Sequence, residues 1–222
     1  MRAPERTKKP DVVIWDWDNT LVDAMPAAVR TMNEVCQKFG IPQLSMEEIL
    51  YIFGRRRADS FWNQFGEKQT EIESFFRERF HHNSMRDIAL MPGAKEVLDF
   101  VKSKGIEQVV ASNKNHDMLV EESRQLGVYP YFSAIKGVSG SSSSKPYLDF
   151  AKELLSGIAY QTLVVIGDGA SDMQFGSNLG AVRIFVRPHL SEREKIEFDY
   201  HAMDLKEVGI ILKRILGEVG DE

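Results

Sequence analysis

The sequence predicts an α/β fold: a doubly wound parallel sheet interrupted by an inserted helical subdomain. Short apolar segments typical of buried central strands recur along the chain, and amphipathic helical segments separate them. Residues 24–89 carry helical patterns without a convincing strand, which predicts the insertion. The expected organisation is a flexible tail at 1–10, a core domain at 11–23 and 90–217, and a helical subdomain at 24–89.

The first strand is expected at Val12–Trp15, because this apolar run is continuous, as in strands buried on both faces. Four helices are expected to follow. The first spans Met25–Phe39, where apolar residues recur at helical spacing, and Ser45 with Glu48 forms a capping-box pattern that begins the second. The third and fourth carry aromatic residues expected to pack between helices rather than to form a ligand cage: Phe61, Trp62, Phe75 and Phe76.

After residue 91, expected strands and helices alternate. The strands are expected at Gln108–Ala111, Phe132–Val138, Leu163–Ile166 and Val182–Val186. Helices are expected to begin near Pro92, Asp117 and Lys145, and a short helix is expected after Asp168 as far as Leu179. Asp204 and Glu207 are expected to cap the last helix. Strands joined by helices in this rhythm are parallel, because each crossover helix returns the chain to the same edge of the sheet.

The amino-acid composition limits the partners and the cellular location that can be expected for the protein. The 222 residues carry a formal net charge of -5 and a pI near 5.6, so neither a nucleic-acid nor a membrane partner is expected. The single cysteine, Cys36, excludes an internal disulfide and is expected to be a packing residue. A bilayer-spanning apolar segment and a secretory signal are both missing, which predicts a cytoplasmic protein. Oligomeric state has no signal in the sequence.

Polar and charged residues follow the expected strands. They are Asp16, Asp18 and Thr20 after the first strand, Ser112, Asn113 and Lys114 after the second, Lys145 after the third, and Asp168 and Asp172 after the fourth. Ligands of such sheets bind beyond the carboxyl ends of the strands. Two adjacent carboxylates repel each other unless a proton or a cation lies between them, and hard oxygen ligands suit Mg²⁺. Carboxylates, a hydroxyl and an ammonium together suit phosphoryl transfer.

Four segments in this order resemble the motifs of the haloacid dehalogenase (HAD) superfamily. They are DWDNT at Asp16–Thr20, Ser112, Lys145 followed by Pro146, and GDGASD at Gly167–Asp172. The helical insertion and the MPGA sequence at Met91 are similar to members with a helical cap, in particular the phosphoglycolate phosphatase-like group. The resemblance extends from Asp11 to about Leu216 and implies a Rossmann-like HAD core with residues 24–89 as the cap.

The resemblance implies a Mg²⁺-dependent phosphatase that hydrolyses a small phosphorylated metabolite, with phosphoglycolate as the reference substrate, through an aspartyl phosphate. Asp16 would be the nucleophile, Asp18 the general acid and base, and Lys145 the group that steadies the nucleophile and the phosphate. Thr20, Ser112 and Asn113 would bind the substrate. The metal ligands would be Asp16, Asp168, Asp172 and the backbone carbonyl of Asp18.

Two alternatives remain open: a sugar phosphate mutase built on the same core, and a non-catalytic HAD-like binding protein. The triplet Ser112, Asn113 and Lys114 favours the phosphatase over the mutase, and the complete set of chemical positions disfavours the binding protein. Arg55 and Arg56, in a run with Arg57, are predicted to bind the substrate because arginine forks recognise carboxylates and phosphates. A solvated basic turn is the other interpretation of this run.

Overall fold

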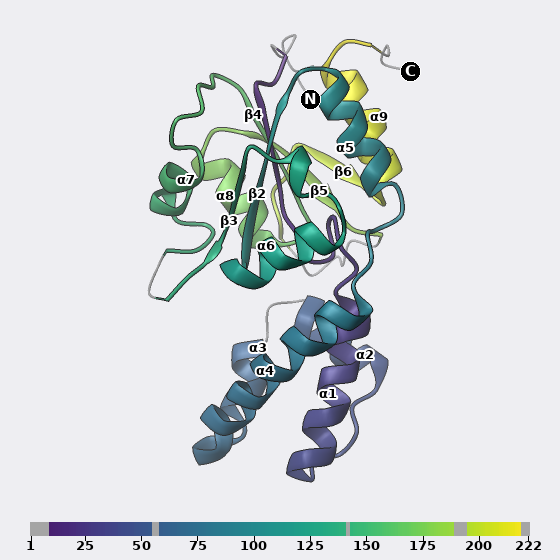
Figure 1. The fold of residues 1–222 in the computed structure, drawn as a ribbon, viewed down its shortest axis with the longest axis vertical. Coiled ribbons are helices and arrows are strands. Elements are labelled where there is room, and N and C mark those ends of the chain that lie inside the picture. The colour runs from purple at the N-terminus through teal and green to yellow at the C-terminus, as the bar shows by residue number, and fades with distance from the viewer. Residues whose placement is uncertain (1–8, 55–57, 141–142, 189–194, 219–222) are drawn as a thin grey trace. The chain divides into compact units, whose positions relative to one another are not determined.

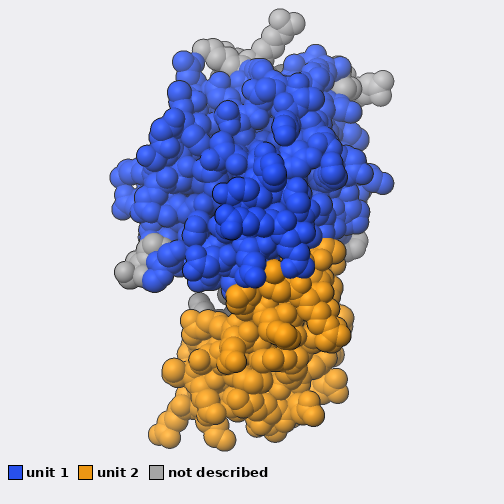
Figure 2. Space-filling view, viewed as in Figure 1, with its two compact units in different colours: residues 1–22, 90–222 blue, residues 23–89 orange. Residues whose placement is uncertain are grey.

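The computed structural model of the chain describes residues 9–54, 58–140, 143–188 and 195–218 (Figure 1). The chain divides into two compact units, one made of residues 1–22 and 90–222 and the other of residues 23–89 (Figure 2). Among the described residues, no helix has both the length and the apolar composition needed to cross a membrane.

The larger unit is built on a parallel six-stranded sheet with the order β3-β2-β1-β4-β5-β6. The strands are β1 (Val12–Trp15), β2 (Glu107–Asn115), β3 (Ala134–Val138), β4 (Leu163–Gly167), β5 (Val182–Val186) and β6 (Tyr200–Ala202). The order reverses at β1, where β2 lies on one side and β4 on the other, and such a reversal is where open α/β sheets bind ligands. The predicted doubly wound parallel sheet is confirmed.

Three strands differ from the sequence-based expectation. β3 begins at Ala134 instead of Phe132, because the backbone amide of Phe132 donates to the carbonyl of Tyr129 in the preceding turn. β2 continues to Asn115 instead of ending at Ala111, because β3 pairs with it again at Asn115 opposite Val138, after a register shift between Ala111 and Asn115. Ser112, Asn113 and Lys114 therefore lie within the last part of the strand. β6 was not predicted, since three residues are too few to show a periodicity.

Helices cover both faces of the sheet. They are α5 (Ala94–Ser103), α6 (His116–Gln125), α7 (Leu148–Leu154), α8 (Ala170–Asn178) and α9 (Leu205–Ile215), with a short 3-10 helix at Tyr129–Tyr131. Phe150 of α7 and Phe175 of α8 pack in one apolar cluster with Val109 and other strand residues. Gln108 points to the opposite face, because side chains alternate along a strand, and its side chain donates to the carbonyl of Leu98 in α5.

The smaller unit, in its described part, consists of α1 (Met25–Phe39), α2 (Met46–Gly54), α3 (Ala58–Asn63), a 3-10 helix at Gly66–Lys68 and α4 (Gln69–Asp87). Ser45 and Glu48 form the expected capping box, in which each backbone amide donates to the other residue's side chain. Trp62 lies in the apolar core, and Phe61, Phe75 and Phe76 pack against that core, as expected of packing residues. Cys36 is also buried.

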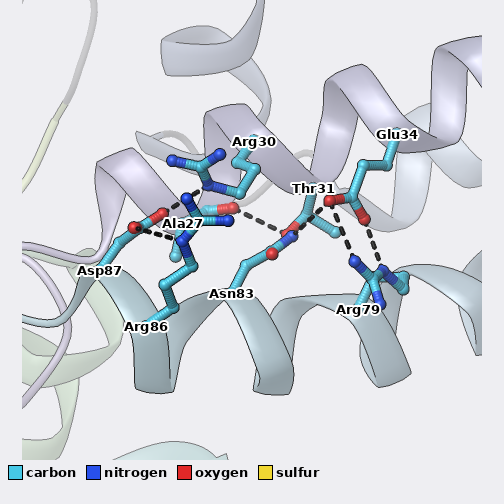
Figure 3. A network of polar contacts seen from close by, with 8 residues as sticks. All are labelled: Ala27, Arg30, Thr31, Glu34, Arg79, Asn83, Arg86 and Asp87. Carbon is cyan, nitrogen blue, oxygen red and sulfur yellow. Dashed lines mark hydrogen bonds and ion pairs between the residues drawn. The ribbon is translucent and has the colours of Figure 1, made fainter.

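Polar contacts join α1 to α4 (Figure 3). The buried amide of Asn83 donates to Thr31 Oγ1 at 3.1 Å and to Glu34 Oε1 at 3.2 Å. Arg79 Nε lies 2.5 Å from Glu34 Oε2, and Arg30 Nε lies 2.6 Å from Asp87 Oδ2. Because a buried amide costs free energy unless it is hydrogen-bonded, the two contacts of Asn83 favour one register of the two helices.

Candidate active site

The candidate site lies at the carboxyl edge of the three central strands. Trp15 of β1 pairs with Val110 of β2 and with Ile166 of β4. Asp16 directly follows β1, while Ser112 and Asp168 each lie two residues beyond the partner of Trp15. Parallel pairing therefore brings residues that are distant in sequence to one edge of the sheet.

A tight turn after β1 brings Thr20 back toward Asp16. The carbonyl of Trp17 accepts hydrogen bonds from the backbone amides of Thr20, Leu21 and Val22. Asn19 has a φ of 62°, a left-handed conformation that asparagine tolerates better than most residues. As a result, Thr20 Oγ1 donates to Asp16 Oδ2 at 3.1 Å.

Three carboxylates and one ammonium form the centre of the site. One carboxylate oxygen from each of Asp16, Asp168 and Asp172 lies within 4.8 Å of the others. Lys145 Nζ lies 2.5 Å from Asp16 Oδ1 and 2.5 Å from Asp172 Oδ1, and its side chain is 2% exposed. One buried ammonium thus contacts two of the three acids, Asp16 and Asp172.

The close approach of these charged groups changes the pKa values of Asp16, Asp168 and Lys145. Burial, together with the nearby Asp172 carboxylate, raises the pKa of Asp16 from 3.8 to about 6, although Lys145 acts in the opposite direction. Burial and the Asp16 carboxylate also raise the pKa of Asp168 well above its usual range. Burial by itself would lower the pKa of Lys145, but Asp16 and Asp172 outweigh it and raise that pKa. The guanidinium of Arg187 donates to the backbone carbonyl of Asp168 at 2.9 Å and acts against the rise of that residue's pKa. A hard divalent cation fits this donor set, because three carboxylates still carry more charge than one ammonium and one guanidinium.

Gly167 allows Asp172 to approach the end of β4. Asp172 lies in the first turn of α8, where its Oδ2 accepts from the backbone amide of Gly169 at 2.9 Å. A Cβ atom on Gly167 would lie 2.5 Å from both Cβ and Cγ of Asp172. The glycine is therefore required for the position of this carboxylate.

The arrangement matches a known family. The model of the haloacid dehalogenase-like hydrolases matches residues 13–186. The chain belongs to this family. The predicted family resemblance and the prediction of a hydrolase are thereby confirmed.

Two relatives of this haloacid dehalogenase-like hydrolase are similar to it over almost their whole length. A phosphoglycolate phosphatase of Chromobacterium violaceum is 25% identical, with 90% of this chain and 96% of that protein covered. A phosphorylated carbohydrates phosphatase of Thermotoga maritima is 24% identical, with 93% and 100% covered. The structure of a haloacid dehalogenase-like family hydrolase from Streptococcus pneumoniae has a TM-score of 0.80 at 19% identity, with 91% and 98% covered, and shows the shared fold.

The other predicted site residues of the hydrolase occupy varied positions. Asn113 Oδ1 accepts from the backbone amide of Lys145 at 2.9 Å, and Ser112 Oγ accepts from the amide of Lys114 at 3.1 Å. The helix expected to begin at Lys145 begins instead at Leu148, because a following proline disfavours the helical conformation of Lys145. The predicted substrate-binding residues Arg55 and Arg56 lie outside the described residues, as does Arg57.

The side chain of Asp18 does not belong to the three-carboxylate group of the hydrolase. Its Oδ1 lies 2.8 Å from Nζ of Lys114, which also lies 2.7 Å from Glu122 Oε1. The sequence indicates Lys114 only as part of the triplet with Ser112 and indicates no role for Glu122. The position of Lys114 beside Ser112 was a usable signal, whereas nothing in the sequence links Glu122 to the site.

Proposed function

We propose that this hydrolase is a Mg²⁺-dependent phosphatase that acts on a small phosphorylated metabolite through an aspartyl phosphate on Asp16. The observation that carries the proposal is the convergence of Asp16, Asp168 and Asp172 around Lys145 at the sheet edge. Relatives named for phosphoglycolate and for phosphorylated carbohydrates support a small phosphoester as the substrate, with phosphoglycolate as the reference compound.

The first half-reaction transfers the phosphoryl group to the enzyme. A carboxylate oxygen of Asp16 attacks phosphorus, the bond to the ester oxygen breaks, and that oxygen takes a proton from the carboxylic acid of Asp18. In the second half-reaction, water attacks the same phosphorus and gives its proton to the Asp18 carboxylate. The bond to Asp16 then breaks and phosphate is released. Thr20, Ser112 and Lys145 are assigned to the phosphoryl oxygens.

The proposed reaction requires a magnesium ion at the carboxylate cluster. Asp16, Asp168 and Asp172, with the backbone carbonyl of Asp18, would hold the ion. The bound ion supplies positive charge that lets a carboxylate approach a phosphate anion. Lys145 keeps the Asp16 and Asp172 side chains oriented by its two contacts.

Residues 24–89 are proposed to act as a helical cap that selects the substrate, with Arg55 and Arg56 as ligands for its acidic groups. Replacing both arginines with glutamine should raise KM for phosphoglycolate without lowering the activity on an aryl phosphate, because the aryl ester lacks the carboxylate that the arginines are proposed to bind. Equal effects on both substrates would favour the alternative interpretation of a solvated basic turn.

The test of the proposed function is phosphate release from a panel of small phosphoesters, with Mg²⁺ or with a chelator. The panel contains phosphoglycolate, sugar phosphates, nucleoside monophosphates and pyrophosphate. Release that requires Mg²⁺ and is confined to one or a few compounds is expected. Absence of release from every compound by folded, Mg²⁺-loaded protein would contradict the proposal and favour the mutase or the binding protein.

Magnesium should stabilise the fold, and this effect should depend on pH. Because the pKa of Asp16 is raised from 3.8 to about 6, protonation of the folded state is favoured in that range, and stability without metal falls as pH rises. Magnesium binds the ionised carboxylates, so the increase in the melting temperature should be larger at about pH 7.5 than at about pH 5. A concentration of about 100 times Kd adds about 2.7 kcal/mol at full ionisation.

The metal dependence can be checked by thermal unfolding with MgCl₂ and with chelator at both pH values. Asp168→Asn should greatly reduce the Mg²⁺-induced shift, because it removes one of the three carboxylates. Asp149→Asn is the matched control, since Asp149 lies on exposed α7 surface with Lys152 as its partner. A shift of equal size at both pH values would contradict the predicted competition with protons.

Gly167→Ala should lower activity strongly. The new Cβ would force Asp172 away from Asp16 and Lys145, and a displacement of about 1 Å at a reacting centre can cost about 10²-fold in rate. The measurement is kcat on the best substrate of the panel, together with the Mg²⁺ dependence. Gly209→Ala is the control, because a Cβ at that helical position meets nothing within 4 Å. Equal activity of both variants would show that Asp172 tolerates the displacement.

A further inference from the structure

A second buried charge network adjoins the candidate site and is not explained by phosphate or metal binding. Lys114 Nζ contacts Asp18 Oδ1 at 2.8 Å and Glu122 Oε1 at 2.7 Å. Glu122 Oε2 in turn accepts from the indole Nε1 of Trp17 at 2.7 Å. The network therefore begins and ends on adjacent residues of the turn after β1.

We propose that Lys114 and Glu122 are positioning residues that hold Asp18 in the orientation for proton transfer to the leaving group. This inference rests on the proposed function, because it assigns Asp18 the role of general acid and base. It adds two residues and one indole hydrogen bond that the phosphatase assignment does not include.

The burial of Lys114 and Glu122 indicates that the network has a functional role. The side chains of Lys114 and Glu122 are 3% and 0% exposed, whereas that of Asp18 is 30% exposed. Buried ion pairs of this kind often contribute no more stability than apolar residues of similar size. Burial alone would lower the pKa of Lys114, but Asp18 and Glu122 raise it, so the lysine stays charged. The buried ammonium of Lys114 thus contacts the carboxylate of Asp18, which is the partly exposed residue of the network.

The geometry of the turn explains why two anchors are needed. Asp18 lies between buried Trp17 and Asn19, which has a left-handed backbone conformation. Glu122 holds the side chain of Trp17 directly and holds that of Asp18 through Lys114. Glu122 lies on α6 and Lys114 lies near the end of β2, whose last residue, Asn115, caps α6. The orientation of Asp18 is therefore set by the end of β2 and by the packing of α6 on the sheet.

The contact with Lys114 involves only one of the two carboxylate oxygens of Asp18. Oδ1 accepts from Lys114, while Oδ2 accepts no hydrogen bond from the residues that the structure describes. A carboxyl group held at one oxygen can present the other to the ester oxygen with little loss of entropy on reaching the transition state. Loss of Lys114 should therefore impair proton transfer and leave the Asp16 nucleophile in place.

The test compares two leaving groups in single-turnover experiments with Lys114→Met. The alkoxide of an alkyl phosphate needs a proton as it departs, whereas p-nitrophenolate departs without one. The alkyl substrate is the best alkyl ester of the panel, and p-nitrophenyl phosphate is the aryl probe. General acid catalysis contributes at least about 10²-fold, so the transfer step should slow by about 10²-fold for the alkyl ester and by less than about threefold for the aryl ester.

A second signature follows from the base role of Asp18 in the hydrolysis of the aspartyl phosphate. The variant should release p-nitrophenol in a burst close to the enzyme concentration and then turn over slowly. Glu122→Gln and Trp17→Phe should show the same selectivity to a smaller degree, and they keep the test usable if Lys114→Met does not fold. Lys136→Met is the control, because Lys136 lies on β3 and forms an ion pair with Glu153 of α7, outside this network.

Equal losses for the alkyl and aryl esters, or no loss for either, would overturn the positioning role. Wild-type protein that hydrolyses neither ester would instead overturn the proposed function. The two failures are therefore distinguishable.

Discussion

Replacement of Asp16 by asparagine is expected to abolish turnover while the fold is retained. An amide oxygen is a poor nucleophile toward phosphorus, so no aspartyl phosphate forms, and the loss should be on the order of 10⁴-fold or more. The fold should survive because the neutral amide removes one of three mutually repelling carboxylates, and Lys145 still has Asp172 as a partner. Phosphate release and the melting temperature are measured on the same purified sample.

Asp149→Asn is the matched control for this experiment. It makes the same chemical change at an exposed position whose only role in the described structure is an ion pair with Lys152. Turnover of Asp149→Asn should equal that of the wild type. Mg²⁺-dependent turnover by Asp16→Asn at more than a few per cent of the wild-type rate would contradict the assignment of the nucleophile.

Lys145→Met should have the largest effect on stability. It leaves the buried carboxylates of Asp16 and Asp172 without their ammonium, and removal of one partner from a buried pair costs about 3–5 kcal/mol. The free energy of unfolding, measured by denaturant titration in chelator near neutral pH, should fall by this amount. Activity should also be lost, because Lys145 is assigned to the phosphoryl group.

The pH dependence of this loss has a definite sign. The folded-state pKa of Asp16 is already raised from 3.8 to about 6, and removal of the neighbouring ammonium raises it further. The folded variant then binds more protons than the unfolded chain over a wider range, so its stability falls more steeply as pH rises. The deficit relative to wild type should therefore shrink as the pH is lowered through about 6 toward 3.8.

Magnesium should restore part of the stability of Lys145→Met near neutral pH, since it neutralises the same carboxylates. Lys152→Met is the control, because Lys152 and its partner Asp149 are both largely exposed, and exposed pairs contribute at most about 1 kcal/mol. If Lys145→Met and Lys152→Met cost the same free energy, Lys145 does not have the predicted role in charge compensation.

Local sequence patterns were sufficient to predict most of the helices and strands of the fold. The continuous apolar run at Val12–Trp15 identified β1, and Leu163–Ile166 identified β4 to within one residue. Asp204 was recognised as a cap, and its Oδ1 accepts from the amides of Lys206 and Glu207. Strand ends were less predictable, because the length of β2 depends on pairing with β3 and not on its own apolar residues.

At the candidate site, too, some features follow from local sequence and others depend on tertiary contacts. The sequence by itself determined that Asp16 and Asp168 follow strands and that Lys145 follows the loop after the third strand, because the alternation of strands and helices and the order of the motifs can be recognised along the chain. Only the tertiary structure decided that Lys145 lies between Asp16 and Asp172.

Only the tertiary structure, too, decided that Lys114 and Glu122 support the turn that carries Asp18. Asp18 and Lys114 are 96 residues apart, and Trp17 and Glu122 are 105 residues apart. No local pattern encodes such contacts. They exist because parallel pairing of β1 with β2 and the packing of α6 bring these side chains into one buried space, where each polar group must find a partner.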